Sequence, residues 1–257
     1  MDDENRESCR QQVDCTDLLG QLGESQKAHL FKLGVVRTNT KDETICCLDS
    51  KNDNAHFVLE GRVKIYELTP EGKEIILWFC SPGELFGFAE TSLAHVSGGQ
   101  RVNAQACGYT RLLIVKSQEF RQFILNQPSI ILPLIQLLGY RLYDIIGVLS
   151  DITSADVASR VVRLLLKLGE RYGKTVERGL HLDIPLTHQE MADMIGTSRQ
   201  TVTTVLGELK RQGMISIEQR SVIIRDIDWL QRGLNYSKFA GRTLDPVVKG
   251  GLANADL

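Results

Sequence analysis

Side chains that could read the bases of double-stranded DNA cluster between Leu186 and Leu206. Arg199 and Gln200 open the second of two short expected helices, and arginine and glutamine make bidentate contacts to guanine and adenine edges in the major groove. The candidate DNA contacts are Thr187, His188, Ser198, Arg199, Gln200, Thr201, Thr203, Thr204 and Lys210.

A helix-turn-helix would position these side chains. Thr187 and Glu190 have the spacing of a capping box, which marks a helix start. Gly196 can take the left-handed conformation that ends a helix, and Ser198 is suited to cap the next one. The buried stripe of the second helix would be Val202, Val205, Leu206 and Leu209. The alternative is an ordinary helix pair inside an α-helical domain.

Length and composition describe an ordinary globular protein. The chain has 257 residues, 42% of them hydrophobic and 24% charged, so one large or two modest domains are expected. No apolar run approaches the ~20 residues that span a bilayer, and the polar N-terminus does not resemble a signal peptide. We therefore expect a cytoplasmic protein without a membrane segment. Because the net charge is −2, any DNA contact must come from a local surface.

The region from residue 35 to 116 alternates short β-rich runs with turn residues. Runs at 54–58, 60–66, 73–80 and 111–115 are separated by sequences such as Thr69-Pro70-Glu71-Gly72. This pattern predicts an antiparallel β-roll or jelly roll. A short helical pattern at 18–33 precedes it.

A long helix is expected from Ile130 to Asp151. Its apolar residues recur at alternating steps of four and three, which is a heptad pattern and predicts a parallel dimer interface. The alternative is a core helix within one chain. Leu134, Leu137 and Ile146 flank this pattern and could pack against the roll. The interface residues are Ile131, Ile135, Leu138, Leu142, Ile145, Leu149 and Ile152.

The C-terminal part predicts a winged helix. A helix running to Tyr172 and a loop at 173–180 precede the helix-turn-helix, and 214–217 with 221–224 would form the hairpin wing. The expected fold class is α+β. Its parts are a flexible tail (1–17), a sensory β-roll (18–125), a dimerisation helix (126–153), a winged helix-turn-helix (154–226) and a C-terminal extension (227–257).

Residues 18 to 225 resemble the Crp–Fnr family of bacterial transcription regulators. The resemblance rests on the segments 58–66, 71–77 and 82–87, and on Leu186 to Ile217. It implies a homodimeric regulator, here expected to be an activator that contacts RNA polymerase, in which a sensory barrel repositions two DNA-binding heads. Two-fold symmetry would require a pseudo-palindromic operator. Arg199 matches the family's guanine-reading arginine, whereas Gln200 and Thr204 depart from its pattern, so a relative's operator sequence cannot be transferred.

The resemblance leaves the effector open. The pocket would include Gly83, Glu84, Phe86, Gly87 and Arg101, but Arg101 lacks the hydroxyl neighbour of the cyclic-nucleotide branch, so cAMP is not expected. The cysteine and histidine of the haem branch are missing between Phe86 and Ala89, although another haem ligation through a histidine or cysteine stays open.

Cysteines offer a second class of signal. Thiolates hold iron–sulfur clusters, and Cys9 and Cys15 have the spacing of half of the oxygen-sensing pattern in this family. A cluster would need Cys9, Cys15, Cys107 and one of Cys46, Cys47 or Cys80. Buried structural thiols and redox-sensing thiols are the alternatives.

Two functions of other classes compete with a transcription regulator. A cupin-type barrel enzyme would need clustered histidines, but His56 and His95 are isolated in the sequence. A ligand-binding module that regulates another protein would leave the helix-turn-helix without a role.

Overall fold

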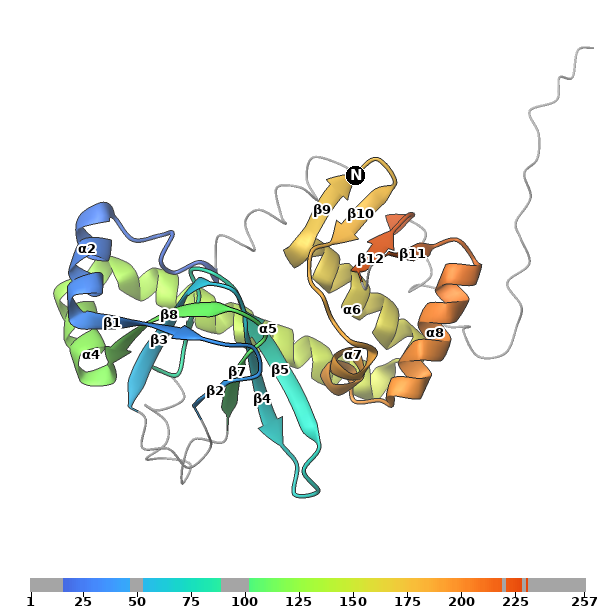
Figure 1. Cartoon of the computed structure of the whole chain (residues 1–257), viewed down its shortest axis with the longest axis horizontal. Coiled ribbons are helices and arrows are strands. Elements are labelled where there is room, and N and C mark those ends of the chain that lie inside the picture. The colour runs from blue at the N-terminus through green and yellow to red at the C-terminus, as the bar shows by residue number, and fades with distance from the viewer. Residues whose placement is uncertain (1–15, 47–52, 89–101, 219–220, 228–229, 231–257) are drawn as a thin grey trace, which may run out of the picture.

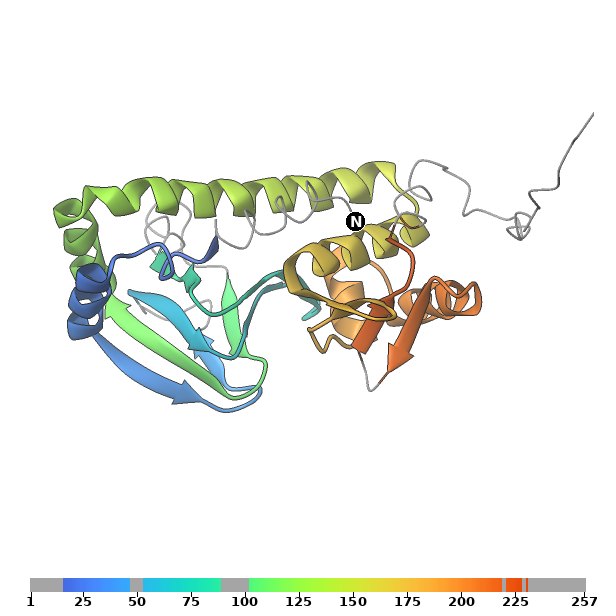
Figure 2. The same ribbon diagram turned by 90° about the horizontal axis from the view of Figure 1, so that it is seen from above.

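A β-roll lies at one end of the molecule and a smaller winged-helix domain at the other, with one long helix running beside both (Figure 1). The computed structural model describes residues 16–46, 53–88, 102–218, 221–227 and 230. Seen from above, the long helix α5 extends along most of the described molecule (Figure 2). The predicted α+β architecture of roll, long helix and winged helix-turn-helix is confirmed.

The β-roll consists of two four-stranded antiparallel sheets, with strand orders β1-β8-β3-β6 and β2-β7-β4-β5. Their bounds are β1 (Gly34–Asn39), β2 (Thr44–Cys46), β3 (Asn54–Glu60), β4 (Val63–Leu68), β5 (Glu74–Cys80), β6 (Leu85–Phe86), β7 (Asn103–Ala106) and β8 (Thr110–Lys116). The sequence predicted β3, β4, β5 and β8. It missed the short strands β2, β6 and β7. It also missed β1, which exposes Val35 and Val36 instead of alternating buried and exposed positions.

Helices α2 (Glu24–Leu33) and α4 (Ser117–Asn126) pack together at the outer end of the roll. The helix predicted from residue 18 begins only at Glu24, since the chain turns first: the Gly20 amide donates to Asp17 Oδ1 at 2.6 Å. Thr16 is buried although it falls within the predicted flexible tail, which was expected to extend to residue 17.

Helix α5 (Ile131–Ser154) follows the 3₁₀ turn η1 (Pro128–Ile130). Leu137 is fully buried and Leu134 is partly buried against the core of the roll, as predicted. Ile146 is 54% exposed, so its expected packing against the roll is wrong. The heptad positions and Ile146 share the outward side because they lie three or four residues apart.

The chain reverses direction after α5 at a very short hinge. Ala155 is extended (φ −112°, ψ 146°), and Asp156 caps helix α6 (Val157–Tyr172) by accepting a hydrogen bond from the Ser159 amide. Helix α6 then runs back along α5 (Figure 2), and Lys167 pairs with Asp144 at 2.8 Å between them. The hinge therefore sets the direction of everything that follows it.

The winged-helix domain contains α6, two further helices and one sheet. The remaining elements are β9 (Gly173–Val176), β10 (Gly179–Leu182), α7 (His188–Ile195), α8 (Arg199–Arg211), β11 (Ile215–Glu218) and β12 (Ser221–Ile224). The predicted loop at 173–180 is wrong: β9 and β10 form a hairpin that extends the wing into a sheet ordered β11-β12-β10-β9. Leu230 is buried in the domain core, which therefore continues past residue 226.

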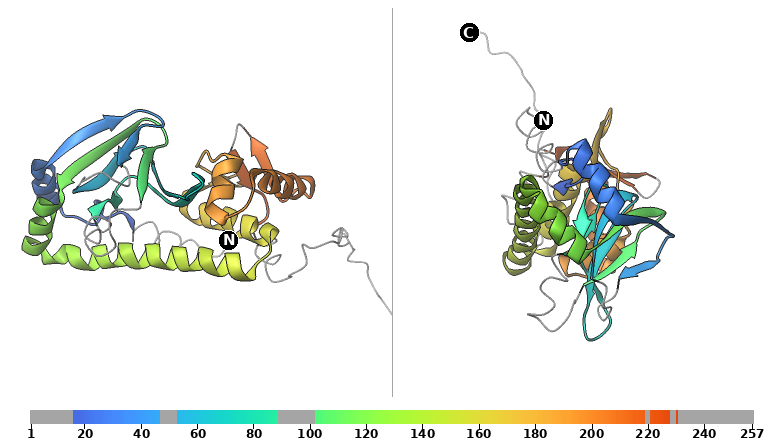
Figure 3. Two further views of the ribbon diagram at one scale, coloured as in Figure 1. Left: turned by 90° about the horizontal axis from the view of Figure 1, so that it is seen from below. Right: turned by 90° about the vertical axis from the view of Figure 1, so that its left-hand side faces the viewer.

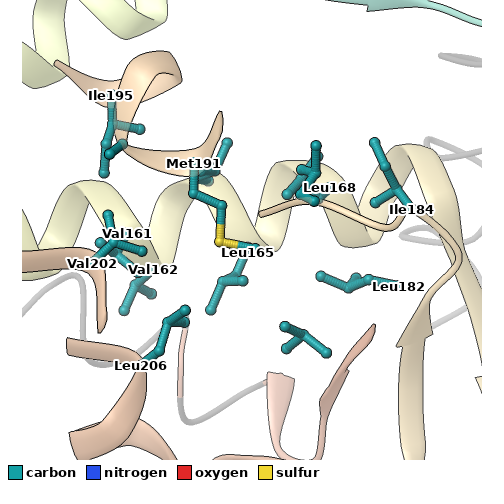
Figure 4. Packing of buried hydrophobic residues seen from close by; sticks show 14 of the residues in the cluster. Val161, Val162, Leu165, Leu168, Leu182, Ile184, Met191, Ile195, Val202 and Leu206 are labelled. Atoms are coloured by element: carbon teal, nitrogen blue, oxygen red, sulfur yellow. The ribbon is translucent and has the colours of Figure 1, made fainter. Parts of the chain in front are cut away.

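The core of this domain continues into the roll. Leu165, Leu168 and Met191 lie at its centre (Figure 4). Ile76 and Phe79 of β5 belong to the same cluster. Figure 3 shows strand β5 directed toward α7, and these two elements are in contact. The two domains therefore touch through apolar as well as polar side chains.

Candidate nucleic-acid interface and its connection to the sensor

The helix-turn-helix has the local chemistry that its sequence predicted. Thr187 and Glu190 form a reciprocal capping box at the start of α7. Gly196 ends α7 with φ 64° and ψ 49°, a left-handed conformation that is costly for other residues. The Ser198 hydroxyl accepts from the Thr201 amide at 3.1 Å and caps α8. The capping box thus defines where α7 begins, and Gly196 and Ser198 define the turn between the two helices.

An exposed polar surface at the start of α8, here called the reading face, consists of Arg199, Gln200, Thr203 and Thr204. The opposite side of the helix buries Val202, Leu206 and Leu209 in the domain core. No described residue donates to or accepts from the Arg199 and Gln200 side chains. Both are therefore available to a ligand.

The other candidate DNA contacts have local roles. Thr203 and Thr204 donate back to the Arg199 and Gln200 carbonyls at 2.9 and 3.1 Å. His188 Nδ1 lies 2.8 Å from Thr203 Oγ1, which ties α7 to the reading face. Thr187, Ser198 and Thr201 are occupied in capping, and Lys210 is exposed near the end of α8.

The seam, defined as the seven predicted interface residues of α5, is exposed along its whole length. The exposed fractions of its side chains run from 39% at Leu138 to 61% at Leu149. By length and composition, Pro128–Thr153 could also cross a membrane, and 17% of its most apolar window is buried. Arg141, Asp144 and Asp151 interrupt it, however, so the apolar residues form a stripe, as in a helix that packs against another helix.

The predicted effector residues do not share one environment. Gly83 (φ 88°) lies against the Asp17 side chain, and its carbonyl accepts from the Leu19 amide at 3.0 Å. Phe86 is buried and stacks on His56, whose pKa is lowered by burial to about 4. Gly87 has φ 88° beside His56. Arg101 lies outside the described residues.

Glu84 connects the roll to the winged-helix domain. It is 3% exposed and forms an ion pair with Arg171, near the end of α6. Arg171 also donates to the Phe79 carbonyl of β5 at 3.2 Å. Its neighbour Tyr172 lies under the Arg62 guanidinium, 4.9 Å from the ring centroid, and burial raises the pKa of Tyr172. We call Arg62, Glu84, Arg171 and Tyr172 the polar junction.

Sequence reasoning missed most of this junction. Arg62 also donates to the Asp183 carbonyl at 3.3 Å, so it reaches the chain that leads into the helix-turn-helix. Arg141 on α5 is 9% exposed, donates to the Leu85 carbonyl and lies 5.0 Å from the Trp78 ring. The one available signal was an arginine within otherwise apolar helix stripes, at 141 and 171.

The cysteines are dispersed across the described chain. Cys46 and Cys80 are buried, and Cys107 is partly buried against the core shared by the two domains. Burial raises the pKa of the Cys107 thiol to about 11. Cys9 and Cys15 lie outside the described residues. No group of three or more metal-binding side chains occurs among those that are described.

Comparison with known proteins identifies the family. A cyclic nucleotide-binding domain model matches residues 36–127, and a Crp-like helix-turn-helix domain model matches 159–232. The chain belongs to the Crp–Fnr family of transcription regulators. It is 30% identical over 192 residues to the CRP-like cAMP-activated global transcriptional regulator of Mycobacterium tuberculosis, covering 75% of this chain and 84% of that protein.

Other relatives agree with this assignment. The chain is 28% identical over 195 residues to the global nitrogen regulator of Synechocystis, covering 75% of this chain and 85% of the relative. The fold matches a CooA mutant from Carboxydothermus hydrogenoformans with a TM-score of 0.73, 24% identity and coverage of 85% of this chain and 96% of that one. FixK2 from Bradyrhizobium japonicum matches with a TM-score of 0.67 and 22% identity, covering 77% of this chain and 96% of that one. This Crp–Fnr protein is therefore a DNA-binding transcription regulator, as its sequence predicted.

Proposed function

We propose that this regulator binds a pseudo-palindromic operator as a homodimer, with one α8 helix in each half-site. The observation that carries the proposal is the reading face: Arg199 and Gln200 are exposed at the start of α8 and have no partner among the described residues. Helices of this kind place their N-terminal residues in the major groove. Arg199 then contacts a guanine and Gln200 an adenine or its neighbour.

Selection of bound fragments from a random DNA pool, followed by fluorescence anisotropy, tests this assignment. Arg199→Ala is expected to weaken operator binding by about 1–3 kcal/mol and to relax the preference at one base pair of each half-site. Arg111→Ala is the matched control, because Arg111 is an exposed arginine on the roll that pairs with Glu60. Unchanged affinity and base preference for Arg199→Ala would show that α8 is not the reading helix.

The seam supports the dimer. Seven aliphatic side chains on one side of a helix would meet water in a monomer, and a parallel partner helix would bury them. The two-fold axis of such a pair relates the two reading faces, which accounts for a symmetric operator. We further propose that the protein is cytoplasmic and that it contacts RNA polymerase as an activator.

For the signal, we propose a small-molecule effector in preference to an iron–sulfur cluster. The positions of the described cysteines support this choice, because Cys46 and Cys80 lie in the core of the roll whereas Cys107 packs against the core of the winged-helix domain. No group of three metal-binding side chains occurs among the described residues, and a cluster needs several thiolates together. Anaerobic purification followed by an absorption spectrum and iron and sulfide analysis tests it. A colourless protein that still binds its operator is expected, whereas a brown protein with bound iron and sulfide would favour a cluster at Cys9, Cys15 and Cys107.

The relative from Mycobacterium tuberculosis is described as cAMP-activated, but this chain has Val102 where the cyclic-nucleotide branch has a hydroxyl residue after its arginine. We therefore do not expect cAMP to be the effector. Isothermal titration with cAMP checks this, and saturable binding would contradict it.

A further inference from the structure

A cavity lies where the hinge brings α5, α6, β5 and α7 together. Its volume is about 300 Å³, near the lower end of the range for small-molecule sites. Most of its wall is apolar and comes from both domains. Its lining includes Trp78 on β5, Tyr140 and Val148 on α5, Arg160 and Leu164 on α6, and Met194 on α7.

Two buried donors of this wall lack acceptors. The indole nitrogen Nε1 of Trp78 and Nε of Arg160 are both shielded from solvent and have no hydrogen-bond partner among the described residues. Burial raises the pKa of Tyr140, so its phenol stays protonated and is a third donor. Buried donors are rarely left unpaired, because a donor removed from water without a new acceptor destabilises the fold.

The charge of Arg160 is not neutralised either. Arg163 pairs with Asp151 and Lys167 with Asp144, whereas Arg160 donates to the Ile195 carbonyl at 2.9 Å and forms no ion pair with a described carboxylate. Glu170 lines the cavity too, but ten residues along α6 place it about 15 Å from Arg160. Burial also raises the pKa of Glu170.

We propose that this hinge cavity binds a small monocarboxylic acid with an apolar body, its carboxylate at Arg160 and its body between Trp78, Leu164 and Met194. A bound molecule would touch both sides of the hinge at once. It would therefore stabilise one orientation of the winged-helix domain relative to α5. This regulatory effect rests on the proposed function, whereas the binding itself does not.

Methyl NMR of the full-length protein without DNA tests binding separately. The probes are benzoate, 3-phenylpropionate, indole-3-acetate and octanoate, each compared with its uncharged amide. At least one acid is expected to shift the Met194 and Leu164 methyl signals saturably, and to bind more tightly than its amide by about tenfold or more. No saturable shift with any of the acids would overturn the proposal.

Variants locate the bound acid. Arg160→Gln is expected to weaken the acid by about tenfold and leave the amide unchanged. Arg163→Gln, which removes a neighbouring charge already paired with Asp151, is the matched control. Val148→Phe fills the cavity from α5 and should abolish the shifts of both acid and amide, even if Arg160→Gln disturbs folding near Ile195.

The second subunit is the competing occupant of this space. If Val148→Phe changed the dimer dissociation constant while no acid shifted the Met194 signal, the cavity would belong to the subunit interface and the proposal would be wrong. If an acid bound in the cavity but left operator affinity unchanged, the site would be confirmed and its regulatory role would be wrong. Failure of the proposed function appears separately, as unchanged operator affinity and base preference in the Arg199→Ala variant.

Discussion

The seam and the polar junction both serve to place the DNA-binding heads, yet they are built from opposite chemistry. The seam is a row of aliphatic side chains, exposed in the single chain, along one side of α5. The polar junction is a buried ion pair, Glu84 with Arg171, together with the stacked pair Arg62 and Tyr172. Apolar contact depends on area and tolerates small displacements, whereas a buried ion pair requires one geometry.

The contrast between the seam and the polar junction concerns two properties of the regulator, the number of its DNA-binding heads and their orientation. We expect the seam to set the number of heads and the junction to hold each head in its orientation. A signal that acts on the junction can therefore change DNA affinity while the subunits stay together.

Leu142→Glu should have the largest effect. Leu142 is 60% exposed in the single chain and lies at the middle of the seam, so a carboxylate there would be buried against its symmetry mate. We expect monomers by sedimentation velocity and a loss of operator affinity of about 100-fold or more, because a single head lacks the second half-site. Tyr143→Ser, at an exposed position beside the seam, should leave both properties unchanged. If the Leu142→Glu protein stayed dimeric, the seam would not be the dimer interface.

Glu84→Ala should destabilise the fold by about 3 kcal/mol, because it leaves the charge of Arg171 buried and unpaired. Chemical denaturation measures this loss. The double variant Glu84→Met with Arg171→Met should recover most of the stability, since apolar replacements remove both charges. Its operator affinity should still differ from that of wild type, because the orientation of the head is no longer fixed. Equal stability of the single and double variants would contradict an ion-pair role.

His56 gives the roll a pH dependence that the seam lacks. Its pKa falls from 6.5 to about 4 because burial disfavours the charged form, so the unfolded chain binds its proton first as the pH falls. The contribution of His56 to the free energy of unfolding is therefore complete above pH 6.5, and it falls by about 3 kcal/mol as the pH drops toward 4. His56→Phe keeps a ring stacked beside Phe86 and should remove this decline when the free energy of unfolding is measured as a function of pH. An identical slope in the variant would assign the pH effect elsewhere.

Ser198→Ala should have the smallest effect, about 1 kcal/mol, because it removes the hydroxyl that caps α8. Thermal unfolding measures the stability change. Ser198→Asp, a good capping residue, should restore the stability, and failure to do so would show that Ser198 acts in another way.

The sequence predicted what depends on local chemistry and periodicity. The capping box at Thr187 and the turn at Gly196 each depend on a few consecutive residues, and the structure has both there. The outward seam depends on a heptad pattern within one helix, and its residues are exposed as that pattern predicts. The hairpin at β9 and β10 was missed because its glycines and charged residues read as a loop, and its pairing with β12 requires a strand some 40 residues away.

The polar junction could not be predicted because its partners are far apart in the chain. Glu84 and Arg171 meet only after the hinge reverses the chain and α6 returns along α5. Glu84 was accordingly predicted to line the effector pocket, and the structure instead pairs it with the DNA-binding head. Arg160 and Trp78 are brought to one cavity by the same reversal.

The hinge at Ala155 has a consequence for how this chain can evolve. Only Ala155 and Asp156 separate the two helices, so this connection is too short to compensate for an inserted or deleted residue. One residue inserted into α5 just before Ala155 would turn the attached head by about 100° and advance it by about 1.5 Å. Both heads of a dimer would turn together, and neither would face its half-site. We expect insertions and deletions among functional relatives to fall in the surface turns and to spare this two-residue connection.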